Sequence, residues 1–185
     1  MSYKNRLWRT VLGFALAALI ASSGAQAQGW QVAPWSARQP MPPFNATDLN
    51  GQLWRLSDLR GKAVLINFWA SWCEPCRAEM PSLQALAQQQ GPHQLVVLAV
   101  NFKESVPTVQ RFVQQSSLQL PVILDPQGLI ARQWGITVFP STVMIKADGH
   151  VQSVLRGELD WTSAQATLLL APLWARAHRA PGQPR

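Results

Sequence analysis

The chain has 185 residues, of which 16 are Lys or Arg and 9 are Asp or Glu, and its formal net charge at pH 7 is +7. The basic residues form no cluster interleaved with aromatic side chains, so nucleic acid is excluded as an expected partner. The length suits one domain with one hydrophobic core, and two cysteines are too few for a small fold held together by several disulfides.

The first 27 residues have the pattern of a secretory signal peptide. Lys4, Arg6 and Arg9 precede an apolar run at residues 11–21, and a small-residue cleavage site follows at residues 25–27. We expect cleavage after this site and therefore export, into the periplasm if the signal is bacterial. The apolar run is shorter than the ~20 residues needed to span a bilayer, so an uncleaved anchor in the inner membrane is the weaker interpretation.

Residues 28–43 contain several prolines and are predicted to be a linker, because proline lacks a backbone N–H and disfavours regular structure. The predicted domain follows at residues 44–178, and the basic, proline-containing end, residues 179–185, is expected to be disordered. Asn50-Gly51 is flanked by two short runs with strand character and predicts a β-hairpin at the start of the domain.

Strand and helix patterns then alternate along the domain. Apolar, β-rich runs indicate buried strands at residues 64–69, 95–100 and 120–124, and helix-favouring runs occur at residues 77–80, 82–87, 107–115 and 129–134. Two further strands, 141–145 and 151–155, flank Asp148-Gly149 and indicate an antiparallel hairpin. A final helix is expected to be capped by Asp160 or Thr162 and interrupted by Pro172. This order predicts an α/β fold in which helical crossovers join parallel strands.

The two cysteines lie in the sequence Trp72-Cys73-Glu74-Pro75-Cys76, between a predicted buried strand and a predicted helix. A thiol at a helix N-terminus faces unpaired backbone N–H groups and the positive end of the helix dipole, which lower a cysteine pKa from about 8.5 to roughly 3.5–7.5. Cys73 is therefore the expected nucleophile. Cys76, one helical turn away, is the expected resolving thiol, which attacks the mixed disulfide at Cys73 and releases the substrate.

Three other interpretations of the cysteine pair are weaker. A structural disulfide across two intervening residues closes too small a loop to restrict the unfolded chain much. A zinc site needs four ligands, and only His93, His150 and His178 remain as scattered candidates. Two inert buried thiols are disfavoured, because a turn that contains Pro75 is expected to be exposed. No metal ligand and no cofactor-binding residue is therefore predicted.

Three parts of the chain resemble the TlpA/ResA family of thioredoxin-like, exported thiol–disulfide oxidoreductases. They are residues 48–51 with 56–62, residues 67–81 around the cysteines, and residues 135–142. The resemblance implies a thioredoxin-like α/β fold, with a mixed central sheet flanked by helices, the N-terminal β-hairpin, and a helix–strand insertion between Phe102 and Leu124. The redox motif, the proline segment, the hairpin and the export signal agree independently, which makes the resemblance specific.

The resemblance also implies roles for residues around the cysteine pair. It places a cis-proline at Pro140, in a loop that faces the cysteines and offers a strand-like edge to a peptide substrate. Phe139 is expected either to contact the substrate or to pack in the core. Trp72, Glu74 and Pro75 are expected on the substrate side of the site.

Glu79 matches an acidic residue that the resemblance places near the cysteines as a proton-handling group. A partly buried carboxylate can exchange a proton with a thiol, and burial raises its pKa. Asn67 stands where thioredoxin itself carries a buried acid, so proton abstraction at that position is excluded. Glu74 adds a negative charge between the cysteines and is expected to oppose thiolate formation at Cys73.

The predicted function is the reduction of disulfides in periplasmic client proteins, without a metal or an organic cofactor. A thiol–disulfide electron donor in the membrane would then re-reduce the cysteine pair. The resemblance suggests clients from cytochrome c maturation or from copper-centre assembly. A disulfide oxidase or isomerase is the alternative among enzymes, and the reduction potential separates it from a reductase. A copper or haem chaperone is the alternative outside them, and metal titration of the reduced protein would reveal it.

Overall fold

The computed structural model describes residues 29–36 and 38–174. The predicted signal peptide at residues 1–27 and the predicted tail at residues 179–185 lie outside this part of the chain. Among the described residues, no helix is both long enough and apolar enough to cross a membrane.

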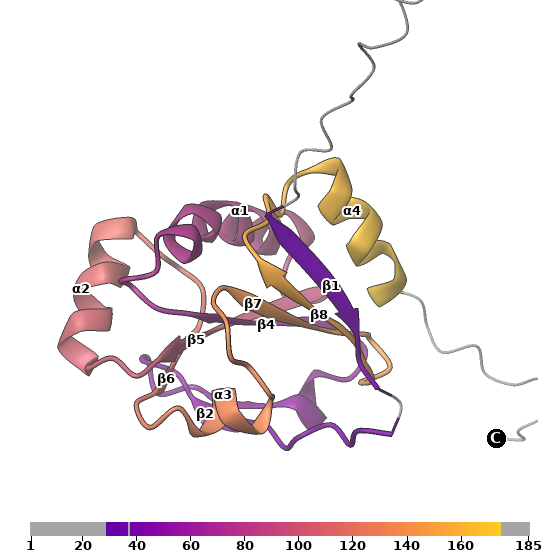
Figure 1. Cartoon of the computed structure of the whole chain (residues 1–185), viewed down its shortest axis with the longest axis horizontal. Coiled ribbons are helices and arrows are strands. Elements are labelled where there is room, and N and C mark those ends of the chain that lie inside the picture. Colours follow the sequence, from indigo (N-terminus) through magenta and orange to yellow (C-terminus); the bar gives the residue numbers. More distant parts are fainter. Residues whose placement is uncertain (1–28, 37, 175–185) are drawn as a thin grey trace, which may run out of the picture.

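A six-stranded sheet with the order β1-β8-β7-β4-β5-β6 forms the centre of the domain (Figure 1). Its strands are β1 (Trp30–Pro34), β4 (Ala63–Trp69), β5 (Leu95–Phe102), β6 (Val122–Asp125), β7 (Ser141–Ile145) and β8 (Val151–Gly157). Strands β4, β5 and β6 run parallel, whereas β7, β8 and β1 are paired antiparallel. Every residue of β4 is buried, because this strand lies in the middle of the sheet and both of its faces are covered.

Helices cover both faces of this sheet (Figure 1). One face carries α1 (Glu74–Gln90), α2 (Val106–Ser116) and α4 (Ala164–Leu170), and the other carries α3 (Leu129–Gln133), the 3-10 helix η1 (Leu56–Leu59) and the small sheet of β2 (Asn45–Thr47) and β3 (Leu53–Arg55). Side chains of β4 alternate between the two cores, since Leu65 and Trp69 belong to the first and Ile66 and Phe68 to the second.

The mixed sheet flanked by helices and the N-terminal hairpin are confirmed, and so is the helix–strand segment made by α2 and β6. The prediction for the last helix was wrong at its first turn. Ser163 caps α4 by accepting a hydrogen bond from the Ala166 N–H at 3.2 Å. Asp160 instead binds Thr162, in the turn that precedes the helix. After Leu170 the chain continues as the short 3-10 helix η2 (Ala171–Leu173), which contains Pro172.

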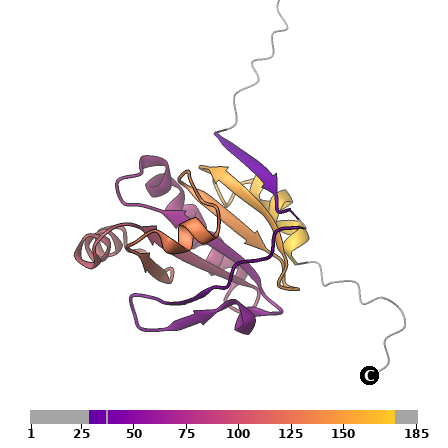
Figure 2. The ribbon, with the colours of Figure 1, turned by 60° about the horizontal axis from the view of Figure 1, so that its bottom comes forward.

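Part of the segment predicted as a linker is also a strand. Trp30–Pro34 forms β1, which pairs with β8 and places Ala33 opposite Val154 at the edge of the sheet (Figures 1 and 2). Proline is tolerated at the edge of a sheet, and Pro34 is the last residue of this strand. The five residues are half-buried or exposed, unlike those of the buried central strand β4.

Candidate active site

The two cysteines lie at the junction of β4 and α1. Cys73 is the N-cap of α1, and its Sγ accepts a hydrogen bond from the Cys76 backbone N–H at 3.3 Å. The two residues are joined by a disulfide, with their Cα atoms 5.3 Å apart. Residues 70–72 therefore connect the buried strand β4 to a cysteine pair at a helix N-terminus, a position typical of redox-active cysteines.

The exposure predicted for this turn is found only in part. Trp72 is 65% exposed and Glu74 is exposed, but Cys73 is only 6% exposed and Cys76 is fully buried. The cysteines are buried because Cys76 lies on the face of α1 that packs against the sheet, with Met80 and Leu83. Of the two, only Cys73 keeps accessible surface.

Glu74 and Pro75 form the first turn of α1. The Glu74 carboxylate pairs with Arg77 at 2.8 Å, and both side chains are largely exposed. An exposed pair is screened by water, and the cation balances the carboxylate. The expected opposition of Glu74 to thiolate formation is therefore weak. Proline is accommodated at this end of a helix because the N–H that it lacks has no partner within the helix there.

The loop opposite the cysteines contains the predicted cis peptide bond, between Phe139 and Pro140. The Phe139 ring contacts the Trp72 ring edge to face, with centroids 6.3 Å apart, so the proline loop touches the cysteine turn. Phe139 is half-buried and packs against both hydrophobic cores. It therefore combines packing in the core with a position at the mouth of the site.

Glu79 is 1% exposed and lies one helical turn after Cys76. Its carboxylate accepts hydrogen bonds from Asn67 Nδ2 at 2.7 Å, from Trp161 Nε1 at 3.2 Å and from the Leu159 N–H at 3.4 Å. Burial raises its pKa from 4.5 to about 7, against the lowering effect of these three donors. The buried acid of this site therefore comes from the helix, and Asn67 on β4 supplies a neutral donor to it.

Sequence reasoning missed Glu104, which follows β5. Its carboxylate accepts hydrogen bonds from the Ser71 backbone N–H at 2.6 Å, from the Ser71 hydroxyl, and from Asn101 Nδ2 at 2.7 Å. It thereby ties the turn before Cys73 to the end of β5. Its position directly after β5 could have indicated this contact, because the carboxyl ends of neighbouring parallel strands meet at one edge of a sheet.

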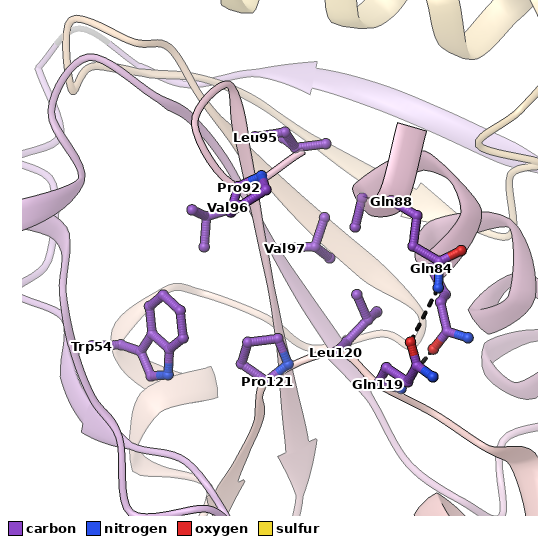
Figure 3. A pocket seen from close by; sticks show the side chains of 11 residues that line it. Trp54, Gln84, Gln88, Pro92, Leu95, Val96, Val97, Gln119, Leu120 and Pro121 are labelled. Carbon is purple, nitrogen blue, oxygen red and sulfur yellow. Dashed lines mark hydrogen bonds between the residues drawn. The ribbon is translucent and has the colours of Figure 1, made fainter. Parts of the chain in front are cut away.

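An apolar pocket of about 260 Å³ has neither cysteine in its lining. Figure 3 shows the side chains that line it. Trp54, Pro92, Val97 and Leu120 line it, together with Gln84 and Gln88 on the second half of α1. These residues lie toward the start of β5, whereas the cysteines follow the end of β4, so this pocket does not belong to the site.

The model of the AhpC/TSA family matches residues 37–154, which include both cysteines, Glu79 and Pro140. The chain belongs to the AhpC/TSA family. Within this thioredoxin-like family it resembles the thiol–disulfide oxidoreductase ResA of Geobacillus kaustophilus, with 36% identity over 118 residues that cover 64% of this chain and 68% of the relative. The thioredoxin-like protein YneN of Bacillus subtilis is also 36% identical, over 124 residues that cover 65% of this chain and 72% of the relative.

Solved structures of thioredoxin-like proteins superpose on this AhpC/TSA family member. A thiol:disulfide interchange protein of Chlorobium tepidum has a TM-score of 0.64 and 27% identity, and the match covers 75% of this chain and 99% of that protein. A secreted thiol–disulfide isomerase of Corynebacterium glutamicum has a TM-score of 0.64 and 26% identity, covering 80% and 92%. The fold is thioredoxin-like, and the protein is a thiol–disulfide oxidoreductase.

Proposed function

We propose that this oxidoreductase reduces disulfides of exported client proteins and that Cys73 is its nucleophile. The difference in accessibility between the two cysteines carries the proposal, because Cys73 keeps accessible surface beside the proline loop and Cys76 has none. A client disulfide can therefore reach Cys73 but not Cys76. The Cys73 position at the N-terminus of α1 favours its thiolate, which is the reactive form.

The reaction is an exchange of two electrons and two protons. The Cys73 thiolate attacks one sulfur of the client disulfide, which forms a mixed disulfide and releases the other client sulfur as a thiol. Cys76, one helical turn away, then attacks the Cys73 sulfur and releases the second client thiol. The enzyme is left with the Cys73–Cys76 disulfide, and a membrane thiol–disulfide donor would return it to the dithiol.

Glu79 serves this exchange as a proton store. Its pKa of about 7 means that the carboxyl group is partly protonated near neutral pH, when an exposed glutamate is fully ionised. Because residues three apart share a helix face, it lies next to Cys76 on the buried side of α1. It can therefore take up or supply the proton of the resolving thiol.

The cellular setting of this proposal comes from the predicted signal peptide and from the relatives. The ResA-type relatives support a thiol–disulfide oxidoreductase, and the predicted signal peptide supports an extracytoplasmic location. Clients from cytochrome c maturation or related metalloprotein assembly are part of the proposal. The secreted relative from Corynebacterium glutamicum is described as an isomerase, which keeps isomerisation as the second candidate. A reductase and an isomerase differ in reduction potential, so a measured potential separates them.

Trapping experiments test which thiol attacks the client disulfide and which resolves the mixed disulfide. In the Cys76→Ser variant the mixed disulfide at Cys73 cannot be resolved, so covalent complexes with client proteins should accumulate and disappear on treatment with dithiothreitol. Cys73→Ser should trap none. The reverse pattern, complexes with Cys73→Ser and none with Cys76→Ser, would exchange the two roles.

A further inference from the structure

An aromatic run extends from the cysteine turn across the mouth of the site. Trp72, next to Cys73, contacts the Phe139 ring, and Phe139 packs against Phe102 in a tilted arrangement with ring centroids 4.6 Å apart. All three side chains are exposed or half-buried, so the run presents apolar surface to solvent beside the disulfide. Such a surface suits an apolar or aromatic residue of a client peptide.

A lysine stands at the far end of this run. Lys103 Nζ lies over the Phe102 ring, 5.1 Å from its centroid, which is within the range of a cation–π contact. The Lys103 backbone has a φ of 56°, a left-handed conformation that side chains other than glycine rarely adopt. Its N–H nevertheless continues the β5–β6 ladder with a 3.0 Å bond to the Asp125 carbonyl. The fold therefore holds this lysine in an unusual conformation.

Gly128 makes room for this arrangement. A Cβ atom at Gly128 would lie 2.8 Å from Lys103 Cε and 2.8 Å from the edge of the Phe102 ring. The glycine backbone and the aromatic ring thus enclose the lysine stem and direct its position. The ammonium group lies over the Phe102 ring, at the end of the aromatic run.

Acidic groups close to Lys103 are engaged elsewhere. Glu104 binds Ser71 and Asn101, and both oxygens of Asp125 accept backbone N–H groups at the start of α3. In residues 29–36 and 38–174, no carboxylate lies within ion-pair distance of Lys103. A cation without an acidic partner, next to an apolar surface, is complementary to a carboxylate on a bound molecule.

We propose that this surface, formed by Trp72, Phe139, Phe102 and Lys103, selects client peptides that carry an acidic residue a few positions from the target disulfide. The inference rests on the proposed reductase function. The separation from the Phe139 ring to Lys103 Nζ is within roughly 10 Å, which an extended peptide covers in about three residues. An apolar client residue over the aromatic rings would place an Asp or Glu of the client beside the ammonium group.

Three synthetic peptides test this specificity. They share one intramolecular disulfide with a leucine beside it, and they differ only at a position three residues from the disulfide, which is Glu, Gln or Lys. The reduced full chain should reduce the Glu peptide fastest and the Lys peptide slowest, with second-order rate constants that differ by about 2- to 5-fold at each step. This preference should shrink as ionic strength rises, because salt screens exposed charges.

Variants assign the preference to Lys103. Lys103→Gln should bring the Glu and Gln peptides to equal rate constants, and Lys103→Arg should keep the preference for Glu. Lys62→Gln is the matched control, because it removes the same charge before the start of β4, at the opposite end of the sheet, and it should leave the ratio of the rate constants unchanged. A preference that persists in Lys103→Gln, or equal reduction of all three peptides by the wild-type chain, would overturn this inference alone. Failure to reduce any of the peptides would overturn the proposed reductase function together with it.

Discussion

Glu79 is a carboxyl group in the protein core, one helical turn after Cys76. Burial destabilises its ionised form, and the hydrogen bonds from Asn67, Trp161 and Leu159 recover part of that cost. The balance places its pKa at about 7, where small changes of pH alter its charge. The charge of the cysteine environment therefore depends on pH through this residue.

Glu79→Gln should change the pH dependence of thiol alkylation in the reduced protein. Ionised Glu79 disfavours a nearby thiolate, and glutamine cannot ionise, so the variant should react faster above pH 7 and should lose the inflection near pH 7. Glu74→Gln is the matched control and should alter the profile little, because Glu74 is exposed and paired with Arg77. Identical profiles for the wild type and Glu79→Gln would leave Glu79 a structural residue only.

The same residue makes a prediction about stability. Since its pKa is 4.5 in an ordinary environment and about 7 in the fold, the folded chain binds more protons between these values, and its stability falls as pH rises through them. The free energy of unfolding of the wild type, relative to that of Glu79→Gln, should fall on the order of 3 kcal/mol from pH 4 to pH 8. Urea unfolding of the disulfide form of both proteins measures this difference. A constant difference across that range would show that the folded environment does not raise the Glu79 pKa.

At the scale of elements, the ends of β4 and β5 and the start of α1 position the cysteine turn together. Residue Asn101 on β5 lies opposite Trp69 on β4, so the residues that follow each strand emerge side by side. Glu104 uses this proximity to bind Ser71, and Cys73 then begins α1 as its N-cap. The turn is therefore fixed at both of its ends by hydrogen bonds.

Glu104→Gln should loosen this turn. The substitution removes the charge that strengthens the bonds to Ser71 and Asn101, and the free energy of unfolding should fall by about 1–2 kcal/mol. Ser71→Ala should cost less, because it removes the hydroxyl bond and keeps the backbone N–H bond. Urea unfolding compares the two variants. An equal or larger loss of unfolding free energy in Ser71→Ala would contradict the conclusion that the charged Glu104 carboxylate holds this turn.

For the whole molecule, the sequence predicted the elements whose own residues carry a strong pattern. Strand β4 is buried along its entire length, and its mostly apolar run marked it clearly. Strand β7 was predicted from Asp148-Gly149, the turn that separates it from β8. The hairpin of β2 and β3 was predicted from Asn50-Gly51, where Gly51 has a φ of 84° that favours glycine. Local residues determine these elements, so one sequence suffices to find them.

Features that depend on distant partners were missed. Strand β1 pairs with β8 at the edge of the sheet, and all five of its residues are half-buried or exposed. The hydrogen bond between Ser71 and Glu104 joins residues 33 positions apart, and no short motif encodes such a contact. The burial of Cys76 likewise follows from the packing of α1 on the sheet, which the turn-like sequence around Pro75 did not indicate.

The reduction potential of the protein should lie toward the reducing end of the thioredoxin-like range. Strong oxidants, with potentials of about −120 mV, owe them to a stabilised reduced form, whereas the potential of thioredoxin is about −270 mV. Ionised Glu79 has the opposite effect, because it destabilises the thiolate of the reduced form. Equilibration of the full chain with a dithiothreitol or glutathione series measures the value. A potential close to that of the strong oxidants would favour the oxidase or isomerase alternative.

The redox state of Cys73 and Cys76 in living cells tests the central claim most directly. Rapid acid quenching followed by alkylation with a maleimide reagent that adds mass separates the dithiol from the disulfide on a gel. A client reductase that is supplied with electrons from the membrane should be found mainly as the dithiol, and should shift to the disulfide when its electron donor is removed. A pair that is found fully as the disulfide in growing cells would contradict the account, because such a protein would donate disulfides rather than reduce them.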